Sequence, residues 1–369
     1  MTRRERTPPW TPCGFAFAFA FASAIALAIA GAACSGAPAG PGAITEPSSV
    51  LPDGGGSSEA SPGLAASSDG GSVAPGDGGA ADPSACGARS GARGSTARTL
   101  TAAGLHRTYR VYLPAGLDPK KPVPLVFVHH GFTMSGKAME AITGYTALAD
   151  QEGFALAFPD GQGGPDSTDA PWNVGAGTCP SLYGDVPVAA GDDFAFLDAM
   201  RADVDRDQCL DASRVYVSGF SMGGYFAHHA GCLRADIRAV APHSGGTHDL
   251  SACPVARKPV ILFHGDADDV IPDGCDDPHA TNTPAGFTPS ATAWAARNGC
   301  GTTVHTVAVE KGTCSYYDGC PADGQVAICV MKGMTHCWAG GAADASGNGC
   351  PGWASATKLE WEFFKTYAW

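Results

Sequence analysis

Three kinds of side chain in this sequence could together carry out nucleophilic catalysis, and they occur in the order serine, aspartate, histidine. They are Ser221, one of the neighbours Asp266, Asp268 and Asp269, and His336. A serine hydroxyl is a poor nucleophile until a base takes its proton, and the base must be held in one tautomer by an acid. We therefore expect Ser221 to act as nucleophile, an aspartate as the orienting acid and His336 as the base.

Ser221 lies in a Gly-x-Ser-x-Gly pattern at residues 219–223, and its flanks favour a sharp turn. Residues 215–217 are Val-Tyr-Val and predict a short buried strand, whereas residues 225–232 predict a helix. Strand, turn and helix are the context in which this pattern forms a nucleophile elbow. The alternative is a glycine-rich turn with no catalytic role, because 50 of the 369 residues are glycine and the pattern can arise by chance.

The other candidate residues also follow predicted buried strands. The aspartates come directly after the strand at 260–263, and His336 follows the strand at 326–331. Ligands bind at the carboxyl ends of the strands in such sheets, so these side chains should meet at one edge. The residues alone do not choose among the three aspartates, and a histidine in a Gly-rich loop can be purely structural.

A tetrahedral intermediate also needs amide donors for its negatively charged oxygen. One donor is expected from Met222, the residue after the nucleophile. The second should come from the loop after the strand at 125–128, at Phe132 or Thr133. Two such donors contribute several kcal/mol to lowering the barrier.

Predicted strands alternate with predicted helices over most of the chain, which indicates a single α/β domain with a mostly parallel, doubly wound sheet. The strands are expected at 109–113, 125–128, 154–158, 215–217, around 239, 260–263 and 326–331. The helices are expected at 138–151, 193–204, 225–232, 291–297 and 356–367. We place this domain at residues 86–369.

The first 85 residues differ in composition from the rest of the chain. Residues 1–34 combine early arginines, an apolar run at 15–33 and small residues before Cys34, which predicts an export signal of the lipoprotein type with Cys34 lipidated. Cleavage after residue 32, or retention as a membrane anchor, are the alternatives. Residues 35–85 contain no Lys, Arg, Tyr, Trp or Phe and predict a disordered Gly/Ser/Ala/Pro linker.

Charge and cysteine content limit the possible partners. The net charge of −13 argues against nucleic-acid binding through a basic face. Fourteen cysteines favour an oxidising compartment, and twelve remain after Cys13 and Cys34, enough for six disulfides. These cysteines are scattered without a Cys-x-x-Cys pair, so we expect no metal site and no cofactor. We expect a monomer that contacts the membrane only through its N-terminal lipid or signal anchor.

Several motifs resemble the secreted α/β-hydrolase esterases that include polyhydroxybutyrate depolymerases, feruloyl esterases and acetylxylan esterases, in which the order serine, acid, histidine is the usual one. The motifs are His130-Gly131, Pro-Trp-Asn-Val-Gly at 171–175, Asp-Asp-Phe-Ala-Phe-Leu at 192–197, the elbow region 214–224, His-Gly-Asp-Ala-Asp at 264–268 and Gly-Met-Thr-His-Cys-Trp at 333–338. The resemblance covers roughly residues 86–369.

The resemblance implies more specific assignments. It selects Asp268 as the acid and His336 as the base. We take Phe132 and Met222 as the oxyanion donors. We also expect Trp172 and Trp338 to contact substrate, because aromatic rings hold sugar or phenolic rings, with core packing as the alternative for Trp172. The resemblance also implies a disulfide between Cys300 and Cys320. The chain departs from the family at Phe132, Thr335 and Cys337, so the loop that carries the base could be braced differently, through a disulfide from Cys337.

These expectations describe an exported serine carboxylesterase, extracellular or in the cell envelope, that hydrolyses feruloyl or acetyl side chains of plant polysaccharides. One alternative is a poly(3-hydroxybutyrate) depolymerase. An alternative of another class is a tethered, non-catalytic surface binding module.

Overall fold

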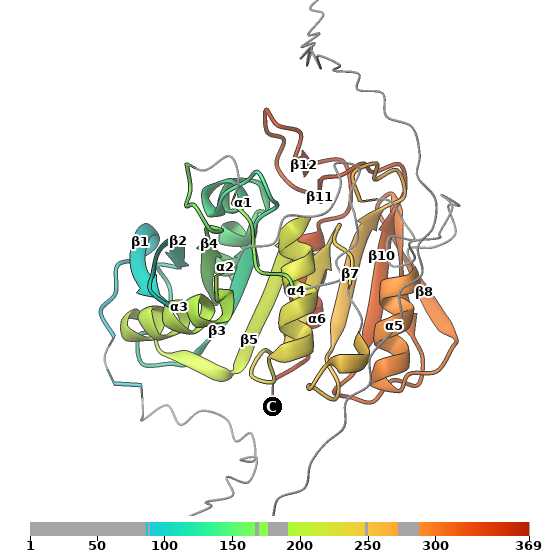
Figure 1. Ribbon diagram of the computed structural model, residues 1–369, viewed down its shortest axis with the longest axis horizontal. Helices are drawn as coiled ribbons and strands as arrows, with labels where there is room; N and C mark the ends of the chain where they lie inside the picture. The colour runs from blue at the N-terminus through green and yellow to red at the C-terminus, as the bar shows by residue number, and fades with distance from the viewer. Residues whose placement is uncertain are drawn as a thin grey trace, which may run out of the picture. The chain divides into compact units, whose positions relative to one another are not determined.

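A ten-stranded sheet forms the centre of the fold in the computed structural model (Figure 1). The structure describes residues 86–368 except 88, 167–169, 176–190, 248–249 and 272–287. The strands are β1 (Gly94–Ala102), β2 (Leu105–Leu113), β3 (Val123–His129), β4 (Ala155–Pro159), β5 (Leu210–Phe220), β6 (Ala239–His243), β7 (Val260–Gly265), β8 (Val304–Val309), β9 (Gly312–Tyr317) and β10 (Val326–Met331).

The strand order is β1-β2-β4-β3-β5-β6-β7-β10-β9-β8. The central strands from β4 to β10 are parallel to one another, as predicted. The two edges are antiparallel: β2 and β1 extend one side, and β9 and β8 extend the other. The parallel core therefore carries all the strands whose carboxyl ends bear candidate site residues.

Helices cover both faces of the sheet. They are α1 (Gly136–Ile142), α2 (Tyr145–Glu152), α3 (Asp193–Asp207), α4 (Met222–Leu233), α5 (Thr288–Asn298) and α6 (Ala356–Phe364). Figure 1 shows α3, α4 and α5 in front of the sheet and α6 behind it. The helical pattern at 138–151 is not one helix as predicted, because Gly144 has a left-handed backbone (φ 73°) that separates α1 from α2.

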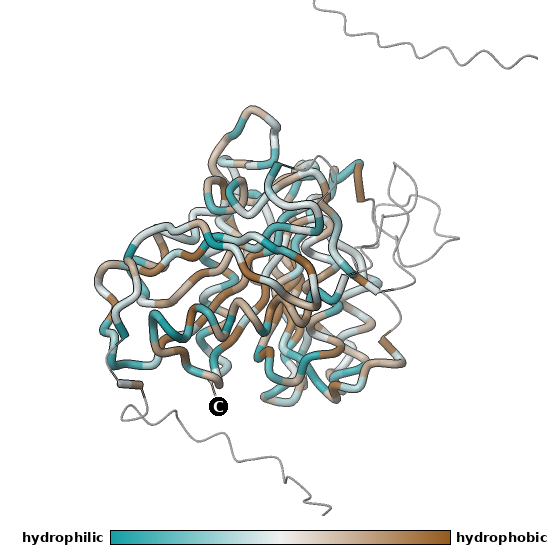
Figure 2. The backbone as a smooth tube through the Cα atoms, turned by 60° about the vertical axis from the view of Figure 1, so that its left-hand side comes forward, coloured by the Kyte–Doolittle hydropathy of each residue, from teal (hydrophilic) through white to brown (hydrophobic). Residues whose placement is uncertain are grey.

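The core consists of two apolar clusters, one on each face of the sheet. Along β3, Leu125 and Phe127 pack on the side of α3 and α4, whereas Val126 and Val128 pack on the side of α2 and α6. Successive side chains of a strand point to opposite faces, so a strand buried on both sides is apolar at every position. Figure 2 shows the apolar segments running through the interior of the described chain.

Five disulfides link the described residues, and the remaining two of the twelve cysteines lie outside them. The pairs are Cys86–Cys209, Cys232–Cys253, Cys300–Cys320, Cys314–Cys329 and Cys337–Cys350. The predicted pair of Cys300 and Cys320 is confirmed, and so is a bridge from Cys337. Disulfides persist in oxidising compartments, so their number supports a location outside the reducing cytosol.

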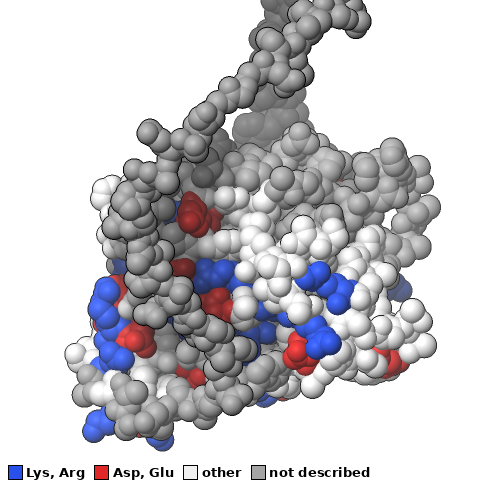
Figure 3. Space-filling view, turned by 60° about the horizontal axis from the view of Figure 1, so that its bottom comes forward, with Lys and Arg blue, Asp and Glu red and all other residues white. Residues whose placement is uncertain are grey.

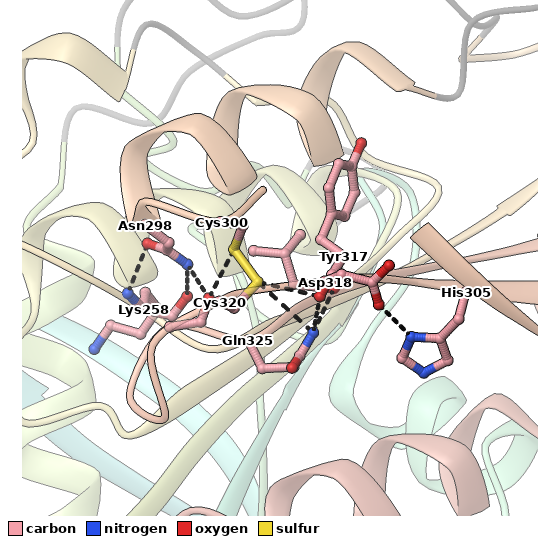
Figure 4. The surroundings of a disulfide bond; sticks show 10 residues. Lys258, Asn298, Cys300, His305, Tyr317, Asp318, Cys320 and Gln325 are labelled. Atoms are coloured by element: carbon pink, nitrogen blue, oxygen red, sulfur yellow. Dashed lines mark hydrogen bonds and ion pairs between the residues drawn. A yellow bond between two sulfur atoms is a disulfide. The ribbon is translucent and has the colours of Figure 1, made fainter. Parts of the chain in front are cut away.

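The Cys300–Cys320 bridge ties the end of α5 to the turn between β9 and β10 (Figure 4). On one side of it, the Asn298 side chain accepts from the Lys258 amide (3.1 Å) and donates to its carbonyl (2.6 Å). On the other side, the Gln325 amide group donates to the Tyr317 carbonyl (2.9 Å). These contacts fix the edge of the sheet next to β10, the strand that precedes His336.

Charged side chains of both signs alternate on the side of the molecule shown in Figure 3. Among the ion pairs of the molecule, Arg98 on β1 pairs with Asp203 (2.7 Å) and with Asp207 on α3. Such partly exposed pairs add little stability individually. They do connect β1, at the antiparallel edge of the sheet, to α3.

The predicted export signal at 1–34, including Cys34, and the linker at 35–85 lie outside the described residues. Within the part of the chain that is described, no helix is both long enough and apolar enough to cross a bilayer.

Candidate active site

Ser221 occupies a strained turn between β5 and α4. Its backbone has φ 56° and ψ −118°, a conformation that costs a non-glycine residue on the order of 1–3 kcal/mol. Its amide donates to the His243 carbonyl (2.8 Å), and its own carbonyl accepts from the Gly224 and Tyr225 amides (2.8 and 3.1 Å). The surrounding backbone therefore enforces the elbow that the sequence pattern predicted.

The elbow requires glycine on both sides of the serine. A Cβ atom on Gly219 would lie 2.2 Å from the Gly223 carbonyl oxygen, and one on Gly223 would lie 2.3 Å from the His129 carbonyl oxygen. Both distances are far below van der Waals contact, so no other residue fits without moving the backbone. The glycines allow β5 and α4 to approach each other closely at the end of β3.

Asp268 and His336 form a hydrogen-bonded pair at the same edge of the sheet. The His336 Nδ1 lies 2.8 Å from Asp268 Oδ2 and 3.0 Å from Oδ1. The backbones that carry them also meet, since the Ala267 amide donates to the Met334 carbonyl (3.1 Å). Of the three aspartates that the sequence left open, Asp268 contacts the histidine, whereas Asp266 and Asp269 are exposed.

The Asp268 carboxylate is held by several donors. The Val270 and Ile271 amides both donate to Oδ1 at 3.0 Å. Burial alone would raise the pKa of Asp268, but the hydrogen bond and positive charge of His336, with smaller effects of His264 and the Ile271 amide, lower its pKa below the usual value. The carboxyl group is therefore ionised at neutral pH and can orient an imidazole.

His264 is a contact of the acid that the sequence analysis did not identify. Its Nε2 donates to the Ile271 carbonyl (2.8 Å) and lies 3.4 Å from Asp268 Oδ2. His264 is the first residue of the His-Gly-Asp-Ala-Asp motif, which the sequence analysis did single out. The motif alone does not show that the loop folds so that Asp268 and Ile271 contact the His264 ring.

The loop after β3 brings Phe132 close to the serine. A Cβ atom on the preceding Gly131 would lie 3.1 Å from Ser221 Cβ. His130 fixes this loop: its Nε2 accepts from the Gly161 amide (2.8 Å), so its Nδ1 carries the proton and donates to the Gly131 carbonyl (2.6 Å). Burial lowers the pKa of His130 to about 4, which keeps it in this neutral form.

Met222 is the first residue of α4, and its amide has no carbonyl one turn earlier in the helix to bind. Phe132 is half-buried, and its carbonyl accepts from the Ala170 amide (3.2 Å). The two residues predicted to supply oxyanion donors therefore stand on the two segments that border Ser221.

Trp172 and Trp338 lie behind the site and not on its surface. Both indoles are completely buried. Trp172 donates from Nε1 to the His130 carbonyl (2.9 Å), and Trp338 donates to the Thr357 hydroxyl (3.1 Å). Their burial leaves no surface for a substrate, so the expected substrate contact is wrong for both, and Trp172 has the alternative role in core packing.

Ser221 and His336 are brought to neighbouring positions without a hydrogen bond between them. The His336 ring packs against Phe220, the residue before Ser221, with ring centroids 4.8 Å apart. No hydrogen bond joins the Ser221 hydroxyl to His336 in the described part of the chain. The structure thus forms the Asp268–His336 pair and the elbow, without a hydrogen bond between them.

A buried carboxyl group lies under the strand that leads to the elbow. Glu360 on α6 has no exposed surface, and it accepts hydrogen bonds from Ser218 on β5 (2.7 Å) and from Tyr145 on α2. Burial raises the pKa of Glu360 to about 8, although the two hydroxyl donors act to lower it. The folded protein therefore holds a proton at Glu360 that the unfolded chain releases at a much lower pH.

This difference predicts a pH-dependent stability. From the ordinary pKa of a glutamate up to about pH 8, the folded state binds more protons, so the free energy of unfolding should fall by up to about 1.4 kcal/mol per pH unit. In Glu360→Gln this contribution is absent, while the amide oxygen can still accept from Ser218 and Tyr145. Denaturant unfolding should show that, from about pH 5 to about pH 8, the free energy of unfolding falls more for the wild type than for Glu360→Gln. Equal losses in both proteins would contradict this assignment.

The described residues contain no group of three or more His, Cys, Asp or Glu side chains placed to hold a metal ion.

Known proteins are similar to this chain in sequence and in fold. Residues 107–277 match the family model described as "Esterase PHB depolymerase". Feruloyl esterase B of Piromyces equi is 28% identical over 268 residues, which cover 70% of this chain and 45% of that protein. Feruloyl esterase C of Emericella nidulans is 31% identical over 175 residues, which cover 45% of this chain and 56% of that protein. The chain thus spans about half the length of these relatives.

Among solved structures, the acetyl xylan esterase from Aspergillus awamori matches with a TM-score of 0.50 and 13% identity, covering 73% of this chain and 99% of that one. At this identity the likeness shows the fold alone, which is that of an α/β-hydrolase, as predicted. In sequence, residues 107–277 of this chain are similar to the esterase PHB depolymerase family, and the two relatives are similar over part of their length.

Proposed function

We propose that this protein is a serine carboxylesterase in which Ser221, His336 and Asp268 form the catalytic triad. The observation that carries the proposal is the strained elbow at Ser221 at the same sheet edge as the Asp268–His336 pair, whose Nδ1–Oδ2 distance is 2.8 Å. Strain at a residue between a strand and a helix is the feature that exposes a nucleophile in this fold.

The reaction proceeds through an acyl-enzyme. The Ser221 oxygen attacks the ester carbonyl carbon while its proton passes to Nε2 of His336. The amides of Met222 and Phe132 donate to the carbonyl oxygen as it becomes negative. His336 then gives the proton to the departing alcohol. A water molecule repeats the sequence, releasing the acid and restoring Ser221, while Asp268 holds Nδ1–H throughout.

The missing hydrogen bond between Ser221 and His336 fits this scheme. Catalytic hydrogen bonds are often long in structures without substrate and shorten when it binds. His336 is held through Asp268, and its ring already rests on Phe220. The mechanism therefore requires a movement of the Ser221 side chain or of the loop that carries His336 when substrate binds.

Feruloyl or acetyl side chains of plant polysaccharides are the proposed substrates. The support comes from relatives named as feruloyl esterases, at 28% and 31% identity. The family description points to poly(3-hydroxybutyrate) as the competing substrate. All three are carboxylic esters, so the same triad serves them, and the difference must lie in the residues that hold the acyl group.

A substrate panel tests both levels of the proposal. The full-length protein is incubated with methyl ferulate, acetylated xylan and poly(3-hydroxybutyrate), and the released acids are measured. Release of ferulate or acetate at least about tenfold faster than hydroxybutyrate supports the substrate assignment, and the reverse order overturns it. In parallel, a fluorophosphonate probe should label the peptide that contains Ser221. Without labelling and without hydrolysis, the protein is the tethered binding module instead.

We further propose that the protein is exported and anchored by a lipid on Cys34. The five disulfides support an oxidising compartment. The mass of the N-terminal peptide of the mature protein distinguishes lipidation at Cys34 from cleavage after residue 32 and from an uncleaved signal.

A further inference from the structure

His243 ends β6 at the point where the segments bearing Ser221, Asp268 and His336 converge. It has no exposed surface, and its sequence gave no reason to single it out. Its backbone carbonyl accepts the hydrogen bond from the Ser221 amide (2.8 Å). The strand register places it beside Phe220 of β5 and Phe263 of β7.

The imidazole of His243 binds the loop that carries the proposed base. Its Nε2 accepts from the amide of Ala339 (3.0 Å), three residues after His336. A backbone amide can only donate, so Nε2 is unprotonated, and the proton lies on Nδ1, which faces the Ser244 hydroxyl (3.2 Å). Burial, together with the nearby charges of His264 and His336, holds the pKa of His243 well below its usual value, so it remains an acceptor at neutral pH.

The same ring contacts the strand that leads to the proposed acid. It lies nearly parallel to Trp338 (centroids 4.8 Å apart, 19°) and to Phe263 (5.8 Å, 14°). Phe263 precedes His264 on β7, and its carbonyl accepts from the Ser244 amide (2.8 Å). His243 is therefore fixed from the acid side as well as from the base side.

The residues after His243 are pressed against the elbow. A Cβ atom on Gly245 would lie 2.8 Å from the Ser221 carbonyl oxygen and 2.6 Å from the Tyr225 nitrogen. A Cβ atom on Gly224 would lie 2.7 Å from the His243 carbonyl oxygen. The backbone of residues 243–245 therefore packs directly against the elbow that carries Ser221.

We propose that His243 is a positioning residue that sets the separation between nucleophile and base: its carbonyl holds the Ser221 amide, and its imidazole holds the Ala339 amide of the base loop. The inference rests on the proposed esterase function. A misplacement of about 1 Å between reacting groups can reduce the rate about 100-fold, so a brace of this kind should affect turnover more than substrate binding.

Two variants separate the features of the side chain. His243→Phe keeps an aromatic ring between Phe263 and Trp338 but removes the acceptor for Ala339. His243→Gln removes the ring but retains an acceptor near the position of Nε2. The matched control is His228→Phe on α4, because His228 is equally buried and its Nδ1 accepts from Trp294 (2.9 Å), a contact that does not reach the base loop.

The expected result is a loss of kcat with a nearly unchanged KM. For a p-nitrophenyl ester, His243→Phe should lower kcat by about 10- to 100-fold, His243→Gln should recover a substantial part, and His228→Phe should stay within about twofold of the wild type. Hydrogen exchange at the peptide containing Ala339 should be faster in His243→Phe and unchanged in His228→Phe.

The inference is overturned if His243→Phe keeps kcat within about twofold of the wild type, or if its Ala339 peptide exchanges at the wild-type rate. It is also overturned if His228→Phe loses as much activity, because the effect would then be general destabilisation. An inactive wild type would refute the proposed function instead, and hydrogen exchange would still decide whether His243 holds the loop.

Discussion

Replacing Ser221 with alanine should reduce kcat for p-nitrophenyl acetate by about 10⁴-fold or more, with the folded structure retained. Alanine lacks the attacking oxygen, and no acyl-enzyme can form without it. The substitution removes one hydroxyl group that makes no hydrogen bond to His336 in this structure, so little stability should be lost. The hydrolysis rate and the circular dichroism spectrum of the purified variant check both parts.

The matched control for this variant is Ser213→Ala. Ser213 lies on the same strand as the elbow, and its hydroxyl donates to Asp211 (2.6 Å) far from the site. Its loss should leave kcat within about twofold of the wild type. Hydrolysis by Ser221→Ala at the wild-type rate would contradict the assignment of Ser221 as nucleophile, and with it the proposed mechanism.

Replacing Asp268 with asparagine should reduce kcat by about 10⁴-fold, because the amide forces the wrong tautomer on His336. The Val270 and Ile271 amides both donate to the Oδ1 position at 3.0 Å, so the carbonyl oxygen of the asparagine must stay there. Its NH₂ group then takes the Oδ2 position, 2.8 Å from His336 Nδ1 in the wild type. Nδ1 must accept this hydrogen bond, so the proton moves to Nε2, which can no longer take the serine proton.

The neighbouring aspartates provide the controls. Asp266→Asn and Asp269→Asn change the same functional group on exposed residues within two positions of Asp268. Asp266 accepts from the Gly333 amide, and an asparagine oxygen can accept in the same way. Both variants should keep kcat within about threefold of the wild type. If either one loses as much activity as Asp268→Asn, the acid has been assigned to the wrong residue.

Much of the parallel core could be predicted because its strands are buried on both faces. A strand such as β3 must be apolar at every position, which produces a continuous run that stands out in the sequence. The edge strands β1, β8 and β9 were not predicted. In β1, inner and outer positions alternate in exposure, and β8 is exposed along most of its length, so neither leaves an apolar run.

Local pattern did not decide the role of side chains whose function depends on what packs over them. The tryptophans at 172 and 338 have the chemistry of substrate-binding residues, but both lie inside the core. Whether an aromatic ring faces a cleft or the interior depends on which segments pack over it. That information is not carried by the motif in which the ring occurs.

The sequence by itself determined the order of the proposed nucleophile, acid and base, the strand–turn–helix at Ser221 and the placement of each candidate after a strand. These features depend on local pattern and strand direction. The residues alone did not choose among the three aspartates, although the resemblance implied Asp268, and the tertiary structure shows that Asp268 faces His336. Only the tertiary structure decided that His264 and His243 join the network and that Cys350 is the partner of Cys337. The physical reason is that these are contacts between segments far apart in the chain, fixed by how loops pack at the sheet edge.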